Sequence, residues 1–166
     1  MKKITPFLWF DNQAEEAANF YVKVFTEGGR NAKIGKIARF GEAAAKASGQ
    51  PKGLVLTVEF ELDGAPFLGL NGGPMFKFSQ ATSFIINCQT QEEVDYFWSK
   101  LSEGGKEGQC GWIDSDKFGV AWQIIPTILD KLLSDPDPLK AESAMKAMLT
   151  MNKLDIAALK KAAGSV

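Results

Sequence analysis

The chain has 166 residues and a formal net charge of −1, because 19 Lys and Arg face 20 Asp and Glu. Apolar residues make up 45% and charged residues 23%, close to the average for a globular domain. The near-zero charge argues against nucleic acid or an anionic membrane as the main partner. We therefore expect neither kind of partner.

The sequence contains no histidine, which excludes His-dependent triads, His general bases and His-ligated zinc from this chain. Its two cysteines, Cys88 and Cys110, are too few for a CxxC metal site and do not suggest a disulfide framework. No apolar run reaches the roughly 18 residues of a membrane span. Pro6 and Asp11 come too early for a signal-peptide core. We expect a cytoplasmic protein with reduced thiols.

The first elements are a strand and a helix. Residues 4–10 are short, apolar and aromatic, which is typical of a buried strand. Residues 12–29 carry apolar side chains at helical spacing. Asn12 and Glu15 resemble a capping pair at the start of this helix, and Gly28-Gly29 marks its end.

A hairpin follows. Residues 32–40 are a weaker strand candidate, and residues 41–53 are typical of a loop or a fraying helical turn. Residues 56–62 alternate apolar and polar side chains and form the clearest strand pattern in the chain. Asp63-Gly64 favours a tight turn, and residues 67–71 return as the partner strand.

The second half repeats this order. Residues 82–88 predict a strand, and Thr90 with Glu93 forms the capping box of the next helix. Two strands are expected at 110–113 and 120–125. Residues 139–163 predict a helical tail with many methionines and leucines.

The two halves match at an offset of 77 residues, which places Glu15-Glu16 on Glu92-Glu93. Further pairs at this offset are Thr5 with Thr82, Phe7 with Phe84, Phe20 with Phe97, Tyr21 with Trp98 and Lys23 with Lys100. We interpret this as a duplication that gives two βαβββ modules in an α+β protein. Module one spans 1–75, module two 80–126 and a C-terminal helical tail 127–166, all within one domain. A ferredoxin-like βαββαβ domain is the alternative.

Three strings carry a resemblance to a known family: ITPFLWFDNQAEEAANFY, LNGGPMFKFSQATSFIINCQTQEEVDYFW and CGWIDSDKFGVAWQIIP. They resemble the PhnB-like family, often labelled 3-demethylubiquinone-9 3-methyltransferase. This family belongs to the vicinal oxygen chelate superfamily of glyoxalase I, bleomycin-resistance proteins and extradiol dioxygenases. The resemblance covers roughly residues 3–160. It implies paired βαβββ modules, a cavity between curved sheets, and a homodimer.

The resemblance also implies where metal-dependent relatives hold their ion. The first-strand ligand positions fall on Thr5 and on Ser83, or on Thr82 if the register slips by one. The last-strand Glu position falls on Gln123 in module two and near Gly69 or Asn71 in module one. These residues are neutral, whereas transition metals bind imidazole, thiolate or carboxylate. We therefore expect no catalytic metal and no cofactor.

The same geometry implies a ligand pocket with an aromatic wall and a few neutral hydrogen-bonding groups. Ala121 and Ile125 would flank it. The residues assigned to the pocket are Thr5, Phe7, Trp9, Asn71, Ser83 and Gln123. The alternative is that these side chains only pack a core.

Other candidates carry less chemistry. Cys110 is the one plausible nucleophile, but it would need Lys106 or Lys117 for activation, so we interpret it as an inert strand residue. Glu59 and Glu61 are interpreted as a solvated outer face of their strand.

Three functions stay open at this stage, and no catalytic residue is assigned. The first is binding of a small apolar or aromatic molecule without a metal. The second is an enzyme in which neutral donors polarise a carbonyl or enolate. The third is the methyltransferase of the family label, for which the sequence lacks a Gly-rich nucleotide-type cradle.

Overall fold

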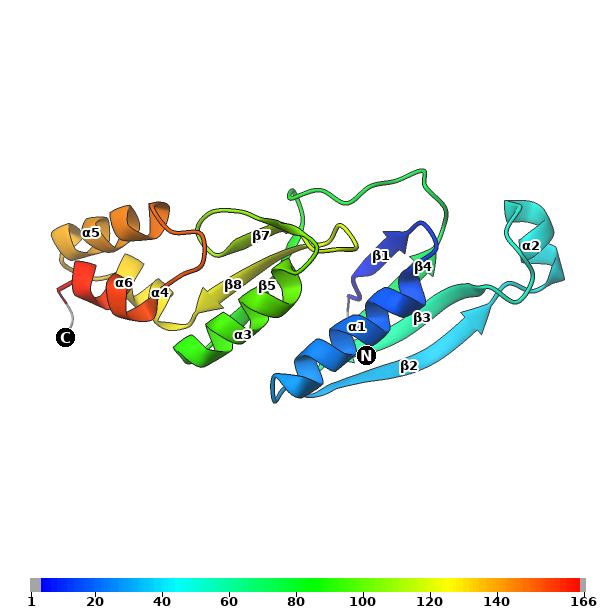
Figure 1. The fold of residues 1–166 in the computed structure, drawn as a ribbon, viewed down its shortest axis with the longest axis horizontal. Coiled ribbons are helices and arrows are strands. Elements are labelled where there is room, and N and C mark those ends of the chain that lie inside the picture. Colours follow the sequence, from blue (N-terminus) through cyan, green and yellow to red (C-terminus); the bar gives the residue numbers. More distant parts are fainter. Residues whose placement is uncertain (1–3, 165–166) are drawn as a thin grey trace. The chain divides into compact units, whose positions relative to one another are not determined.

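The computed structural model divides the chain into two compact units, Met1–Lys77 and Phe78–Val166 (Figure 1). Residues 4–164 are described, so residues 1–3 of module one and residues 165–166 of the tail lie outside the described residues. The boundary falls between the two modules expected from the sequence. No helix in the described part is long and apolar enough to cross a membrane.

Unit 1 is a four-stranded sheet covered by one helix. The strand order is β1-β4-β3-β2, with β1 parallel to β4 and the other pairs antiparallel. Its elements are β1 (Phe7–Phe10), α1 (Ala14–Glu27), β2 (Ala32–Arg39), α2 (Glu42–Ser48), β3 (Val55–Leu62) and β4 (Ala65–Asn71). The short helix α2 stands where the sequence suggested a loop or a fraying turn, and it ends at Gly49 in the left-handed conformation.

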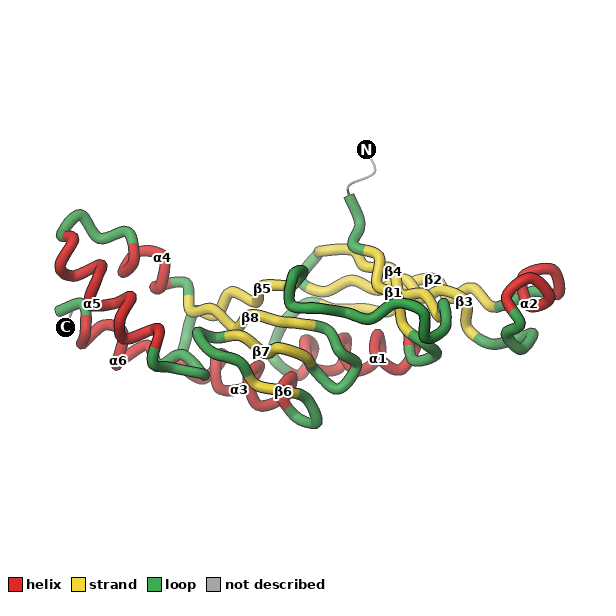
Figure 2. Tube along the Cα trace, turned by 90° about the horizontal axis from the view of Figure 1, so that it is seen from above, coloured by secondary structure: helices red, strands yellow, loops and turns green. Residues whose placement is uncertain are grey.

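The helix α1 lies on one side of the strands β1 to β4 (Figure 2). Its apolar stripe packs against the sheet, where Tyr21 approaches Phe60, and Phe60 stacks on Phe67 with ring centroids 5.2 Å apart. The buried residues of α1 are Ala14, Ala17, Ala18, Tyr21, Val24 and Phe25. Three alanines in this stripe allow the helix axis to approach the sheet closely.

The start of α1 is capped differently from the sequence prediction. The expected pair of Asn12 and Glu15 does not cap it: the N-cap position is Gln13, without a side-chain hydrogen bond. Instead, the backbone N–H of Ala14 donates to Oδ1 of Asn71, 2.8 Å away and 57 residues further along the chain. The local pattern was misleading because the cap comes from the end of β4.

Unit 2 has the same strand topology. Its sheet order is β5-β8-β7-β6, again with the first strand parallel to its neighbour and the other pairs antiparallel. Its elements are β5 (Ser83–Cys88), α3 (Gln91–Ser102), β6 (Lys106–Glu107), β7 (Trp112–Ser115), β8 (Ala121–Pro126), α4 (Ile128–Leu133), α5 (Pro138–Leu149) and α6 (Ile156–Ala162). Two separate sheets of identical order confirm the paired βαβββ modules and exclude the single-sheet ferredoxin-like alternative.

The capping box of α3 is confirmed. The N–H of Glu93 donates to Thr90 Oγ1 at 3.2 Å, and the N–H of Gln89 donates to Glu93 Oε2 at 2.6 Å. The apolar stripe of α3 is buried: Val94, Phe97, Trp98 and Leu101.

The repeat offset needs one correction in the first strands. The N–H of Gly72 donates to the carbonyl of Phe10, and in unit 2 the N–H of Thr127 donates to the carbonyl of Cys88. Phe10 and Cys88 are therefore equivalent, which gives an offset of 78 in the strands against 77 in the helices. The loop between β1 and α1 is one residue longer than its counterpart, so the sequence pairing of Phe7 with Phe84 is wrong.

The turn between β7 and β8 lies at residues 116–119, where Asp116 organises it. This carboxylate is 3% exposed. It accepts hydrogen bonds from the backbone N–H groups of Phe118 and Val120, at 2.8 and 3.0 Å, and from Trp122 Nε1 at 2.8 Å.

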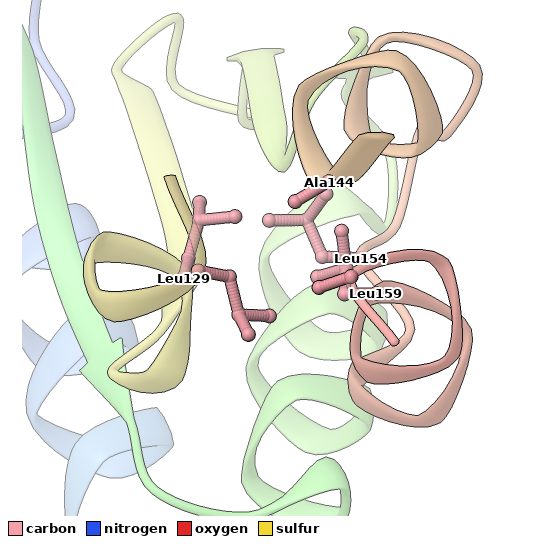
Figure 3. Close-up of a cluster of buried hydrophobic side chains, with 6 residues drawn as sticks. Leu129, Ala144, Leu154 and Leu159 are labelled. Atoms are coloured by element: carbon pink, nitrogen blue, oxygen red, sulfur yellow. The ribbon is translucent and has the colours of Figure 1, made fainter. Parts of the chain in front are cut away.

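The described part of the tail forms three helices in place of the one helical segment expected. Side chains from α4, α5, α6 and the loop between α5 and α6 point toward one another in a small core (Figure 3). Its buried members are Leu129, Leu132, Ala144, Leu154, Leu159 and Ala163. Gln91 of α3 joins this core to the module, since its amide donates to the carbonyl of Leu154 and accepts from the N–H of Ile156.

Candidate functional site

Each sheet has one face that its helix does not cover, here called the open face. Side chains alternate along each strand, so every second residue reaches this face. In β1, Leu8 and Phe10 are buried toward α1, whereas Phe7 is 54% exposed on the open face. In β5, Ile86 and Cys88 are buried toward α3, whereas Ile85 is 56% exposed.

In unit 2, two of the expected site residues meet on the open face. Gln123 Nε2 donates to Ser83 Oγ at 2.8 Å. Gln123 lies between Ile85 of β5 and Trp112 of β7 in the strand register. These three residues, Ile85, Gln123 and Trp112, are called the Gln123 row. It offers a neutral amide and a hydroxyl between two apolar side chains.

The equivalent positions in unit 1 are Phe7, Leu68 and Glu59, called the Glu59 row. Leu68 lies opposite Phe7 in β1 and opposite Glu59 in β3. Phe7 and Ile85 are equivalent at the corrected offset of 78, so their register partners Leu68 and Gln123 are equivalent too. The module-one Glu position, which the resemblance implied near Gly69 or Asn71, therefore corresponds to Leu68, the residue before Gly69. Gly69 faces the helix, because a Cβ there would meet Ala14 at 3.4 Å.

A cavity of about 540 Å³ lies over the open face of unit 1. The expected pocket residue Thr5 lines it. The other lining residues are Lys33, Gly35, Glu59, Phe60, Glu61, Pro66, Phe67 and Leu68. Glu59 and Glu61 do lie on the outward side of their strand, as the alternation indicated. Sequence reading gave no sign that this side carries a cavity, since the strand β2 that borders it has only a weak pattern.

Trp9 reaches the open face but is held by its own chain. Its Nε1 donates to the carbonyl of Gly73 at 2.9 Å, and Phe76 packs edge-on against its ring at 4.9 Å. A Cβ on Gly72 would lie 2.3 Å from the indole ring, so the ring rests directly on the backbone there. The loop after β4 thus covers part of the aromatic wall that the sequence suggested.

Asn71 does not reach the open face. It is 2% exposed, and both ends of its amide are used: Oδ1 accepts from Ala14, and Nδ2 donates to the carbonyl of Val55 at 2.9 Å. Its register opposite the buried Phe10 places it on the helix side. Asn71 fixes the start of α1 and is corrected from a pocket residue to a structural one.

The residues at the ligand positions that the family resemblance implies do not fit a transition metal ion. Ser83 and Gln123 supply a hydroxyl and an amide, which are already hydrogen-bonded to each other, and Leu68 supplies no donor. Imidazole, thiolate and carboxylate are the ligands that hold such ions tightly. Among residues 4–164, no group of three His, Cys, Asp or Glu side chains lies close enough to hold an ion.

Cys110 lies in the turn before β7, and not in a strand as expected. It adopts a left-handed conformation with φ of 57°, and its N–H donates to the carbonyl of Met151 at 2.7 Å. The next residue, Gly111, donates to the carbonyl of Asn152 at 2.7 Å. This turn therefore attaches the loop before α6 to the module, which accounts for the unusual backbone.

These features define a class of protein: two βαβββ modules of the glyoxalase and bleomycin-resistance type, each with an uncovered sheet face. Solved structures share this fold. The protein PA1353 from Pseudomonas aeruginosa is 18% identical, with 76% of this chain and 98% of that chain covered and a TM-score of 0.57. The fosfomycin resistance protein FosX from Listeria monocytogenes is 12% identical, with 78% and 94% covered and a TM-score of 0.52.

The particular family follows from two further matches. The family model described as 3-demethylubiquinone-9 3-methyltransferase matches residues 2–125. A putative 3-demethylubiquinone-9 3-methyltransferase, PhnB protein, from Bacillus cereus is 32% identical, with a TM-score of 0.65, and 76% of this chain and 100% of that chain are covered. No curated protein matches the chain significantly. The chain belongs to this PhnB-like family.

Proposed function

We propose that this protein binds a small, mainly apolar molecule on its open sheet faces without a bound metal ion. The observation that carries the proposal is the cavity of about 540 Å³ over the open face of unit 1. Its volume lies within the range of small-molecule sites, about 300 to 1,000 Å³. Apolar side chains with a few polar groups are the usual lining of such sites.

Two exposed apolar side chains support the same proposal. Phe7 and Ile85 hold equivalent positions in the two modules, and each leaves more than half of its surface uncovered. Burying such a side chain is favourable by about 1.5 to 3 kcal/mol. Because about half of each side chain is already buried, a ligand that covers either one gains about half of this contribution.

The test is a small-molecule thermal-shift screen on the wild type and on Leu68→Arg. We expect compounds that raise the melting temperature of the wild type, and loss of this shift in Leu68→Arg, whose side chain fills and charges the cavity. The control is Leu149→Arg on α5, since Leu149 is 55% exposed and lies outside the cavity. A screen without any stabilising compound, or equal shifts in both variants, would contradict the proposal.

The absence of a metal requirement is tested separately. The protein is incubated with zinc, nickel, manganese or iron salts and then dialysed against metal-free buffer, and its bound metal is measured. We expect far less than one ion per chain. Near-stoichiometric metal would contradict this part of the proposal and would restore metal-dependent chemistry of the superfamily.

A second candidate is an enzyme that polarises a carbonyl or enolate with neutral donors. The Ser83–Gln123 pair on the open face of unit 2 favours it, because an amide N–H can stabilise developing negative charge. Turnover found in a substrate screen and lost in Gln123→Leu would support it.

The methyltransferase of the family name is tested by S-adenosylmethionine, for which we expect no thermal stabilisation.

We also propose a homodimer, as the family resemblance implied. Light scattering after size-exclusion chromatography should give twice the mass of one chain. A single-chain mass at micromolar concentration would contradict it.

A further inference from the structure

The cavity of unit 1 carries one negative charge in excess. Among the described residues, three charged side chains line it: Lys33, Glu59 and Glu61. Lys33 lies opposite Glu61 in the strand register, and its Nζ is 3.4 Å from Glu61 Oε2. Within residues 4–164, the side-chain carboxylate of Glu59 makes no hydrogen bond or ion pair. Lys33 and Glu61 therefore neutralise each other, and the charge of Glu59 is left for another partner.

A bulge in β2 keeps the space beside Glu59 open. Ile34 pairs with Phe60 and Ile37 with Val58, so two residues, Gly35 and Lys36, lie opposite Glu59. A Cβ at Gly35 would lie 3.0 Å from the Cβ of Glu59 and 3.3 Å from its carbonyl oxygen. Gly35 does not have a positive φ, so its lack of a side chain is explained by space and not by backbone conformation.

Apolar side chains stand next to this carboxylate. Leu68 lies beside Glu59 in the register, and Phe7 lies beyond Leu68 in the same row. Pro66 borders the cavity from the same strand as Leu68. The Glu59 row therefore runs from an exposed aromatic ring, across an aliphatic side chain, to a carboxylate without a partner.

We infer that this site takes an organic cation, with an apolar or aromatic body over Phe7 and Leu68 and an ammonium group at Glu59. The inference rests on the proposed function, which supplies a ligand, and adds its chemical class. A neutral ligand would leave the carboxylate of Glu59 without a counter-charge. An organic anion would be repelled by the excess negative charge.

The experiment compares three probes of one shape: naphthylmethylamine, naphthylmethanol and naphthoate. Binding is measured by calorimetry at pH 7 and low salt. We expect the amine to bind about threefold more tightly than the alcohol, which is the scale of a solvent-exposed ion pair, and the anion to bind most weakly. Raising the salt concentration to about 0.5 M should reduce the difference, because exposed charges are screened.

Two variants inside the cavity should act in opposite directions. Glu59→Gln should abolish the preference for the amine, whereas Lys33→Gln should increase it, because Glu61 loses its cation. The matched control is Glu16→Gln, an exposed carboxylate on α1, which covers the other face of the sheet. It changes the net charge equally and should leave the preference unchanged. Thermal melting checks that each variant is folded.

The outcomes separate the two proposals. Equal affinity for amine and alcohol, a preference for naphthoate, or an amine preference that persists in Glu59→Gln would each overturn the inference and leave the binding function standing. Failure of every compound in the wider screen would remove the binding function and this inference together.

Discussion

The two modules share one topology but place their polar groups differently on equivalent rows. In unit 1 the row reads Phe7, Leu68 and Glu59, and in unit 2 it reads Ile85, Gln123 and Trp112. Both rows have an exposed apolar residue on their first strand. The polar residue differs in position: it is Glu59 on the third strand of the row in unit 1, and Gln123 on the second strand in unit 2. Duplicated folds can thus preserve packing while the chemistry of each open face changes independently.

The modules also differ in what fixes their turns and helix starts. Unit 1 uses a long-range cap, Asn71, for α1, whereas unit 2 uses a local capping box at Thr90 for α3. At the turn before the last strand, Asp63 of unit 1 is exposed and Asp116 of unit 2 is buried. Paired substitutions at these positions can break or sharpen the comparison.

The largest difference is expected at the turns. Asp116→Ala removes the acceptor of three buried N–H groups, and we expect a loss of about 3 to 4 kcal/mol in the free energy of unfolding. Asp63 forms a 2.6 Å ion pair with Arg30 near the surface, so Asp63→Ala should cost about 1 kcal/mol or less. Urea unfolding followed by circular dichroism measures both. If both variants lost the same free energy of unfolding, burial of the Asp116 hydrogen bonds would add nothing to stability.

The helix caps should differ by less. Asn71→Ala leaves the N–H of Ala14 and the carbonyl of Val55 buried without their partner, and we expect a loss of about 2 to 3 kcal/mol. Thr90→Ala removes one exposed cap and should cost about 1 kcal/mol. The same urea measurements apply, and a larger loss for Thr90→Ala would reverse the assignment of the stronger cap.

The loop that covers Trp9 is tested by Gly72→Ala. The added methyl group would collide with the indole ring, so we expect a loss of about 1 to 3 kcal/mol and a shift in tryptophan fluorescence. Gly41→Ala is the control, because nothing lies within 4 Å of a Cβ there. Unchanged fluorescence in Gly72→Ala would show that the ring does not rest on this backbone.

The smallest effect concerns the attachment of the tail to α3. A hydrogen bond from Lys153, and to a smaller extent one from Gln91, lowers the pKa of Asp95 from its ordinary value of 3.8. A carboxyl whose pKa is lowered in the folded state stabilises it above pH 3.8, and this contribution is lost as the pH falls through the folded-state pKa. The pair is half exposed, so Lys153→Gln should cost at most about 1 kcal/mol at pH 7.

Urea unfolding between pH 7 and pH 3 tests this linkage. The stability difference between the wild type and Lys153→Gln should shrink as the pH falls below 3.8. Lys131→Gln on α4 is the control and should show no such trend. A difference that grows at low pH would contradict the assigned role of Lys153.

Local patterns in the sequence predicted most of the elements. The alternation in residues 56–62 and the capping box at Thr90 each correspond to an observed element, because their signals lie within a few neighbouring residues. The short strand β6 and the division of the tail into three helices were missed. A two-residue strand has no periodicity, and the tail helices are defined by packing around Leu129, Leu154 and Leu159.

The sequence by itself determined the duplication and the family, because repeated strings and helix stripes survive without knowledge of contacts. The family resemblance suggested Thr5, Ser83 and Gln123 as pocket residues; Thr5 lines the cavity of unit 1, and Gln123 is hydrogen-bonded to Ser83 in unit 2. Only the tertiary structure decided the register of the rows, since one extra residue before α1 changes which side chains are equivalent. It also decided that Asn71 is a helix cap and that no side chain within residues 4–164 pairs with the Glu59 carboxylate, because both depend on residues brought together from distant parts of the chain.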